Sequence, residues 1–299
     1  MTVRVGISGW VYPSWRGNFY PRGLPQRLEL NYVAQRMGSA EINSSFYRLQ
    51  TASVYERWAE QTPPGFEFAV KGGRFITHTK RLREIDAPLA NFFASGPLAL
   101  GQRLGPVLWQ LPQNLEPNLA RLAEFLERLP RTTTATARLA RSHDERLPTN
   151  RTWLRPGPHR PVRHVLEVRH RDFAEPGLRA RLVALLRDQD VGLVISESAG
   201  QWPMLTDVSA DLVYVRLHGD RQLYTSGYGP VALRRWADRI EVWREDGRDV
   251  YVYFDNDAKG RAPHDALALQ RLCCATDNGR TALAAGSIAP WADAEVPPR

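Results

Sequence analysis

Several features that define other protein classes are scarce in this 299-residue chain. Its two cysteines are adjacent, at Cys273 and Cys274, and cannot build a disulfide framework or a cysteine-rich zinc site. No apolar run approaches the about 20 residues that cross a bilayer. The first ten residues also lack the hydrophobic core of a signal peptide. These absences predict a soluble, cytoplasmic protein.

Lysine is rare and arginine is abundant. Lys71, Lys80 and Lys259 are the only lysines among 40 basic residues, which exceed the 32 acidic residues by eight. Residues 121–181 hold 14 arginines against seven acidic residues and carry most of this excess. One explanation is a GC-rich genome that writes arginine wherever a solvated cation suffices. The other is an anionic partner, since guanidinium groups match phosphate geometry.

Short β-type runs alternate with longer amphipathic segments along the chain, as βα units require. The predicted strands are Val3–Ser8, Ala40–Asn43, Glu67–Lys71, Pro106–Gln110, Arg163–Arg169, Val191–Ser196, Leu212–His218 and Val250–Asp255. Eight βα units in one chain predict an α/β fold, a single (β/α)₈ TIM-type barrel. A doubly wound sheet is the rival, but the turn after the first strand lacks the glycine-rich phosphate-binding spacing.

No composition shift marks a second domain. We expect the barrel to occupy residues 1–284, with a basic insertion around 131–161 that is rich in Thr, Arg and Pro. Residues 285–299 are expected to form a C-terminal tail.

Polar side chains end most of the predicted strands, where a TIM-type barrel places its active site. They include Glu41, Asn43, Lys71, Gln110, Glu167, Arg169, Arg216, His218, Asp255 and Asn256. Residues two apart in a strand point to the same face, so Glu167 with Arg169 and Arg216 with His218 are predicted to face the barrel axis. Trp10, Tyr12 and Tyr47 add aromatic rings in the loops after the first two strands, where they could stack on a sugar or a base.

Several of these segments together resemble one known family. They are Gly6-Ile-Ser-Gly-Trp10 with Tyr12, Glu41-Ile-Asn-Ser-Ser-Phe-Tyr47, Lys71, Leu108-Trp-Gln-Leu-Pro112, Glu167-Val-Arg-His170, Val215-Arg-Leu-His-Gly219 and Tyr253-Phe-Asp-Asn256. The set resembles the YecE-like family, domain of unknown function 72, from about residue 3 to about residue 272. The resemblance implies a TIM-type barrel and supplies no reaction. Arg171-Asp-Phe173 departs from the family pattern, in which a tryptophan is common, and the segment 131–161 is longer and more basic than usual.

The first hypothesis for function is an enzyme that acts on a phosphate-bearing substrate: a nucleotide, a sugar phosphate or nucleic acid. Lys71, Arg169 and Arg216 would bind the anion. The predicted catalytic residues are Glu167 as the general acid or base, Glu41 as a second carboxylate and His218 for proton transfer near neutral pH. Further substrate contacts are predicted for Asn43, Gln110, Asn256, Trp10, Tyr12 and Tyr47.

The sequence requires no cofactor. If a divalent metal takes part, Glu41, Glu167, His218 and Asp255 would supply ligands for Mg²⁺ or Mn²⁺. The alternative functions are a non-catalytic barrel that binds nucleic acid through residues 121–181 and a glycosidase-like hydrolase with paired carboxylates. The sequence itself specifies neither a substrate nor an oligomeric state.

Overall fold

The computed structural model describes residues 1–278, with side chains described up to residue 274, so the predicted tail at 285–299 lies outside the described residues. Eight parallel strands form a closed barrel in chain order, and the last strand pairs with the first. The strands are β1 (Val3–Ser8), β2 (Ser39–Ile42), β3 (Glu67–Lys71), β4 (Leu104–Gln110), β5 (His164–Glu167), β6 (Val191–Glu197), β7 (Leu212–Leu217) and β8 (Asp249–Phe254). The predicted TIM-type barrel is confirmed.

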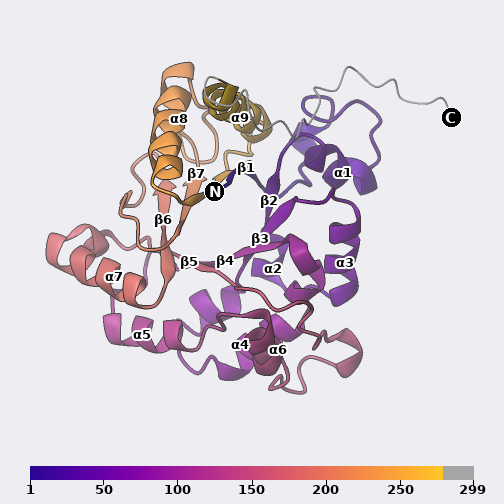
Figure 1. Cartoon of the computed structure of the whole chain (residues 1–299), viewed down its shortest axis with the longest axis vertical. Helices are drawn as coiled ribbons and strands as arrows, with labels where there is room; N and C mark the ends of the chain where they lie inside the picture. Colours follow the sequence, from indigo (N-terminus) through magenta and orange to yellow (C-terminus); the bar gives the residue numbers. More distant parts are fainter. Residues whose placement is uncertain (279–299) are drawn as a thin grey trace.

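Helices surround the barrel (Figure 1). They are α1 (Glu29–Ala34), α2 (Ser44–Tyr47), α3 (Ala52–Glu60), α4 (Asp86–Ala94), α5 (Leu119–Glu127), α6 (Thr133–Ala140), α7 (Pro176–Asp188), α8 (Pro230–Glu245) and α9 (Ala262–Asn278). Within residues 1–278, none of them has the length and apolar character needed to span a bilayer.

The segment predicted as a basic insertion contains α6, which packs against α4. The Thr132 hydroxyl caps this helix by accepting a hydrogen bond from the backbone N–H of Ala135 at 3.1 Å. Arg160, near the end of the segment, donates to the backbone carbonyl oxygens of Leu104, at 2.9 Å, and Gly101. Part of the basic charge therefore fixes the outer layer of the barrel, where the sequence suggested a loop.

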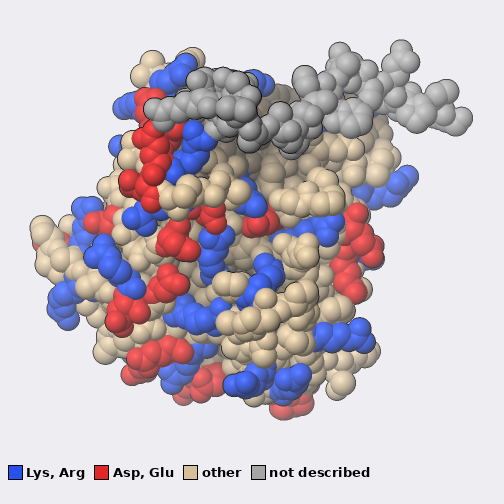
Figure 2. All heavy atoms as spheres, in the orientation of Figure 1, with Lys and Arg blue, Asp and Glu red and all other residues tan. Residues whose placement is uncertain are grey.

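Charge of one sign does not dominate the surface in view. Figure 2 shows basic and acidic side chains interspersed over the face that it presents. On this face, basic side chains therefore have acidic neighbours.

Apolar side chains from β3 to β8 meet inside the barrel. This inner cluster consists of Ala69, Leu108, Val165, Val194, Leu212, Tyr214, Tyr251 and Tyr253. Alternate residues, such as Val213, Val215 and Val252, point outward into a larger core beneath the helices. The inner cluster fills the middle of the barrel and forms a floor for whatever lies at its carboxyl end.

Ion pairs close the amino end of the barrel. Arg4 contacts Glu67 at 2.7 Å, and Arg163 contacts Asp249 at 2.8 Å. The Tyr251 hydroxyl, which lies between them, donates to Glu67 at 2.7 Å. With this end closed, the carboxyl ends of the strands are the place where a substrate could enter.

Candidate active site

A buried arginine at the carboxyl end of β7 organises the mouth of the barrel. The Arg216 guanidinium donates Nε and Nη2 to Glu41 Oε2 and Oε1 at 3.0 and 2.8 Å. It also donates Nη1 to Glu167 Oε2 and Nη2 to Asp255 Oδ2, each at 2.9 Å. These four residues, from β2, β5, β7 and the end of β8, form what we call the Arg216 cluster.

Glu41 is fully buried within this cluster. The Ser8 hydroxyl donates to its Oε1 at 2.8 Å, and the Tyr214 hydroxyl donates to its Oε2 at 2.7 Å. Together with Arg216, these donors give each carboxylate oxygen two hydrogen bonds. The arrangement fixes the Glu41 side chain against Arg216, with no surface exposed to solvent.

Glu167 is equally buried. Its Oε1 accepts a hydrogen bond from Arg169 Nε at 2.6 Å and one from the Ser196 hydroxyl at 3.4 Å. Burial raises the pKa of Glu167, but the positive charges of Arg169 and Arg216 outweigh burial and hold the pKa below its usual range. Glu167 is thus a carboxylate enclosed between two guanidinium groups.

His218 lies against the cluster and is also fully buried. Its Nδ1 is 3.0 Å from Asp255 Oδ2, and its Nε2 is 3.4 Å from Arg216 Nη1. Burial, followed by the charge of Arg216, lowers the pKa of His218 and keeps the imidazole neutral. Burial raises the pKa of Asp255, yet Arg216 and the hydrogen bond with His218 bring it below the usual range. The Asp255 side chain retains 15% exposure.

The predicted metal ligands come together, but they do not fit a metal centre. The guanidinium of Arg216 occupies the position between Glu41, Glu167 and Asp255 where a cation would lie. Within the described residues, no group of three or more His, Cys, Asp or Glu side chains could hold a metal ion. No role for Mg²⁺ or Mn²⁺ follows from this geometry.

Lys71, the last residue of β3, is a cation of the mouth that lacks a carboxylate partner. Its side chain is buried, with 8% of the residue exposed, and its Nζ lies 4.4 Å from the centre of the Phe46 ring. In the described part of the chain, no carboxylate lies within 4.0 Å of Nζ, the limit for an ion pair. Burial and the nearby charge of Arg216 lower the pKa of Lys71 to about 8.

Arg169 follows β5 and is held in place on both sides. Its guanidinium carbon is 3.8 Å from the centre of the Trp202 ring, while Nε pairs with Glu167. Trp202 itself is fixed by a hydrogen bond from Nε1 to the Ser196 hydroxyl at 2.9 Å. Within the described residues, Arg169 forms one ion pair, with Glu167, and it also acts electrostatically on the Tyr224 hydroxyl. Trp202 lies in the loop after β6, and the strand pattern gave no signal for it.

The charges of three cations act on His78, a residue that sequence reasoning missed. Burial lowers the pKa of His78 most, the charges of Lys71, Arg74 and Arg169 add to this effect, and together they bring the pKa to about 4. His78 belongs to the π-helical turn Phe75–Thr79, which follows β3 and brings its ring to 5.0 Å from that of Phe46. The Thr-His-Thr-Lys sequence after a strand-end lysine was the available signal.

Trp10, Tyr12 and Asn43 line a hollow of about 270 Å³ beside the mouth. Trp10 is mostly buried, and its ring packs against that of Trp58 at 5.3 Å. The Tyr12 hydroxyl donates to the backbone carbonyl of Ser8 at 2.6 Å. These residues shape one wall of the entrance.

The remaining predicted contacts are more dispersed. Tyr47 is 69% exposed, and Gln110 is buried with Nε2 on the carbonyl of its neighbour Leu111 at 3.4 Å. Asn256 is fully buried, and its Nδ2 donates to Asp265 Oδ2 at 2.8 Å and to the carbonyl of Ser226 at 3.0 Å. Asn256 therefore ties the loop after β7 to α9.

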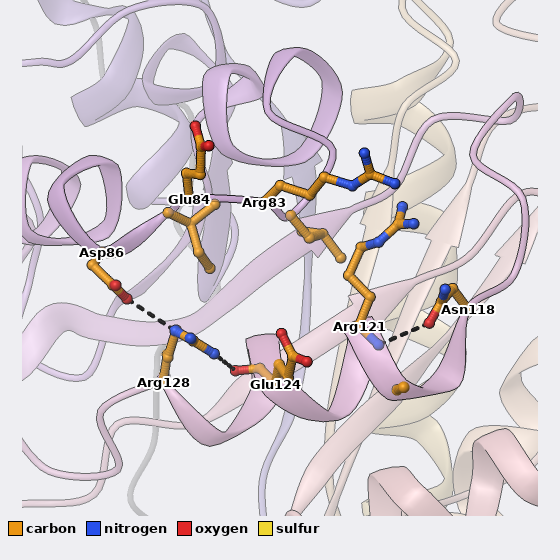
Figure 3. A pocket seen from close by; sticks show the side chains of 10 residues that line it. Arg83, Glu84, Asp86, Asn118, Arg121, Glu124 and Arg128 are labelled. Carbon is orange, nitrogen blue, oxygen red and sulfur yellow. Dashed lines mark hydrogen bonds and ion pairs between the residues drawn. The ribbon is translucent and has the colours of Figure 1, made fainter.

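A larger hollow of about 370 Å³ lies away from these residues, between the segment 82–86 and α5. Figure 3 shows the Arg83 and Arg121 side chains extending in the same direction at one edge of this hollow. Arg128, at the other edge, donates to Asp86 at 2.9 Å. None of the predicted site residues lines this hollow.

The closed parallel barrel, with its polar side chains gathered at the carboxyl ends of the strands, defines a (β/α)₈-barrel protein with one candidate site at the mouth. The chain belongs to the family described as "Protein of unknown function DUF72", whose profile matches residues 4–287. The family resemblance carried by the motifs is thus confirmed.

Individual relatives support the same fold. The crystal structure of a DUF72 family protein from Thermotoga maritima is 22% identical and has a TM-score of 0.70, with 91% of this chain and 99% of that chain covered. One from Enterococcus faecalis is 14% identical with a TM-score of 0.71, over 98% and 100% of the two chains. The UPF0759 protein YunF of Bacillus subtilis is 27% identical over 115 residues, which cover 37% of this chain and 40% of that protein.

Proposed function

We propose that the protein is an enzyme that acts on a small phosphate-bearing substrate at the mouth of its barrel. The observation that carries the proposal is that Lys71 ends β3 and Arg169 follows β5 at the same end of the barrel, where the charges of both, with that of Arg74, act on His78. Among the described residues, neither Lys71 nor Arg74 has a carboxylate within ion-pair distance. Uncompensated positive charge in a partly enclosed site attracts an anion, and guanidinium groups bind phosphate in a bidentate manner.

Arg169 and Arg74 would bind the phosphate group. Arg169 is preorganised for this role because Trp202 and Glu167 fix its guanidinium plane. The charge of Lys71 acts on both His78 and the Arg216 cluster, so this lysine lies between the phosphate subsite and the carboxylates. The reacting part of the substrate would then lie beside Lys71.

The burial of the predicted catalytic carboxylates changes their assigned roles. Glu41, Glu167 and His218 have no exposed surface, and their polar atoms face Arg216 and its neighbours. We assign them as positioning residues that hold Arg216 and, through it, Asp255. Asp255 is the member of the cluster with a partly exposed side chain, and because its pKa is lowered it takes the role of a base.

Calorimetric titration with inorganic phosphate tests the proposal. Arg169→Ala should weaken binding by about 1–3 kcal/mol, because charge-assisted hydrogen bonds are lost. Arg171→Ala is the matched control, since the Arg171 side chain is 93% exposed and lies two residues away. Equal phosphate affinity in wild type and Arg169→Ala, with both variants folded, would contradict a phosphate subsite in the mouth.

Nucleic acid is the second candidate ligand, and it is favoured by the hollow shown in Figure 3. Arg83 and Arg121 line this hollow, and within the described chain neither has a carboxylate at ion-pair distance. Fluorescence anisotropy with a labelled single-stranded RNA would test this function. Binding that weakens with salt and is lost in the Arg83→Ala/Arg121→Ala variant would support it. Undiminished binding in that variant would exclude this hollow as the binding surface.

A further inference from the structure

We infer that Lys71 is a nucleophilic amine that forms a Schiff base with an aldehyde or ketone substrate. The inference rests on the proposed function, because together they define the substrate as a phosphorylated carbonyl compound. The phosphate would lie at Arg169 and Arg74, and the carbonyl carbon would lie at Lys71 Nζ.

The position of the Lys71 amine favours this reaction. Lys71 ends a barrel strand at the carboxyl side, where its side chain enters the mouth, and 8% of the residue stays exposed. The ring of Phe46 covers one side of Nζ at 4.4 Å. Lys71 thus keeps a small exposed fraction at the mouth, while the Phe46 ring and the surrounding protein keep most bulk water away from the side chain.

The carboxylates of the mouth already form ion pairs with Arg216. Arg216 binds Glu41, Glu167 and Asp255 at 2.8–2.9 Å. Lys71 is consequently left beside a second cation with no carboxylate of its own. Desolvation and a neighbouring positive charge are the two conditions that convert a lysine into a neutral nucleophile.

The lowered pKa of Lys71 is consistent with this geometry. With its pKa at about 8, Lys71 holds about one tenth of its amine in the neutral form at pH 7. An unperturbed lysine holds less than about 0.1% at that pH. The uncharged amine required for attack is thus far more abundant at Lys71 than on an ordinary surface side chain.

The covalent step balances without a further reactant. The Lys71 ammonium first releases one proton to solvent, the Nζ lone pair adds to the carbonyl carbon, and a second proton moves from nitrogen to the carbonyl oxygen to give a neutral carbinolamine. The proton released first returns to the hydroxyl group, the carbon–oxygen bond breaks, water leaves, and a protonated imine remains. Its positive charge replaces the charge of the ammonium form, so the balance with the Arg216 cluster is preserved. The imine acidifies the adjacent C–H bond, and Asp255, the partly exposed carboxylate whose charge acts on Lys71, would accept that proton.

The low lysine content makes the test direct. The chain has three lysines, and Lys80, which pairs with Glu84 at 2.7 Å, and Lys259 serve as internal references. Wild-type protein is incubated at pH 7 with glycolaldehyde phosphate and sodium cyanoborohydride, which reduces the imine to a stable secondary amine. Peptide mass spectrometry then locates the adduct. We expect Lys71 to be modified at least tenfold faster than either reference lysine.

The pH dependence and two variants complete the experiment. The rate at Lys71 should rise to half its maximum near pH 8, as its amine deprotonates. Lys71→Arg should lose the adduct while keeping the positive charge, and Lys80→Arg should leave labelling at Lys71 unchanged. Labelling spread over Lys80, Lys259 and the amino terminus, with Lys71 unmodified in folded protein, would overturn the inference.

Labelling with unphosphorylated glycolaldehyde distinguishes failure of the Schiff base from failure of the phosphate subsite. Faster labelling of Lys71 by the phosphate ester supports both. Equal labelling by the two aldehydes supports the Schiff base and contradicts the phosphate subsite. Phosphate binding that depends on Arg169, without labelling at Lys71, supports the subsite and overturns the Schiff base.

Discussion

Arg216 and Glu41 lie 175 positions apart in the chain, yet their side chains form a two-pronged ion pair inside the barrel mouth. Both side chains are fully buried. The pair joins β7 to β2 across strands β8 and β1, which separate them in the sheet. The groups to which we assign reactivity, Lys71 and Asp255, depend on this pair because it fixes the charge around them.

Removing the guanidinium should destabilise the whole fold. Arg216→Gln leaves three buried or partly buried carboxylates without their shared cation, and the free energy of unfolding should fall by about 3–5 kcal/mol. Urea unfolding measures the change. Arg171→Ala, at a side chain that is 93% exposed, should stay within about 0.5 kcal/mol of wild type. A loss below about 1 kcal/mol in Arg216→Gln would show that the cluster is not a structural element.

His78 should make stability depend on pH below neutrality. The pKa of His78 is about 4 in the folded protein and near 6.5 in an unfolded chain. Between these values the unfolded state binds more protons, so the free energy of unfolding falls as pH drops from 6.5 to 4. His78→Gln should reduce this slope by less than about 1.4 kcal/mol per pH unit, because the residue is partly exposed.

Unfolding curves at several pH values compare this variant with His159→Gln, which changes an exposed histidine. The control should follow wild type. Identical slopes for His78→Gln and wild type would show that His78 is protonated freely in the folded state.

Asn256 should contribute to stability, whereas the sequence pattern predicts a substrate contact. Asn256→Ala removes the donor to Asp265 and to the carbonyl of Ser226, and unfolding free energy should fall by about 1–3 kcal/mol. Phosphate affinity should not change. Asn114→Ala, at an exposed position, provides the comparison. A phosphate affinity lowered tenfold in Asn256→Ala would restore the substrate-binding role.

Gly6 is required for the pairing of β1 with β2. A Cβ atom at this position would overlap the backbone carbonyl of Ser39, its register partner on β2. Gly6→Ala should therefore cost about 1–3 kcal/mol or more in thermal or urea unfolding. Gly177→Ala, in the first turn of α7, meets no atom within 4 Å and should be neutral or slightly stabilising. Equal stability of the two variants would contradict the close approach.

The local alternation of apolar and polar residues was sufficient to predict the strands, because it indicates which face of each strand is buried. Alternation in Glu167-Val-Arg169 and Arg216-Leu-His218 correctly predicted that each pair shares a face, and the 2.6 and 3.4 Å contacts within the pairs follow from that. The break between α4 and the segment that follows it was not visible in this way. It falls at Gly96, whose φ of 128° glycine readily adopts, between α4 and the 3₁₀ segment Pro97–Arg103.

The partners of these side chains could not be predicted from the strand ends alone. Asp255 and Asn256 are neighbours, but the chain directs the first to Arg216 and the second to Asp265 on α9. Trp202 and His78 lie in loops, where periodicity carries no information about position.

The sequence by itself determined the eight strands, the family and the set of polar residues at the strand ends, because hydrophobic periodicity and local motifs are properties of short segments. Only the tertiary structure decided which cation would neutralise which carboxylate. Closing the barrel placed one guanidinium among three carboxylates and left the Lys71 amine without one. That outcome depends on distances between strands remote in the chain, since electrostatic energy depends on separation in space rather than in sequence.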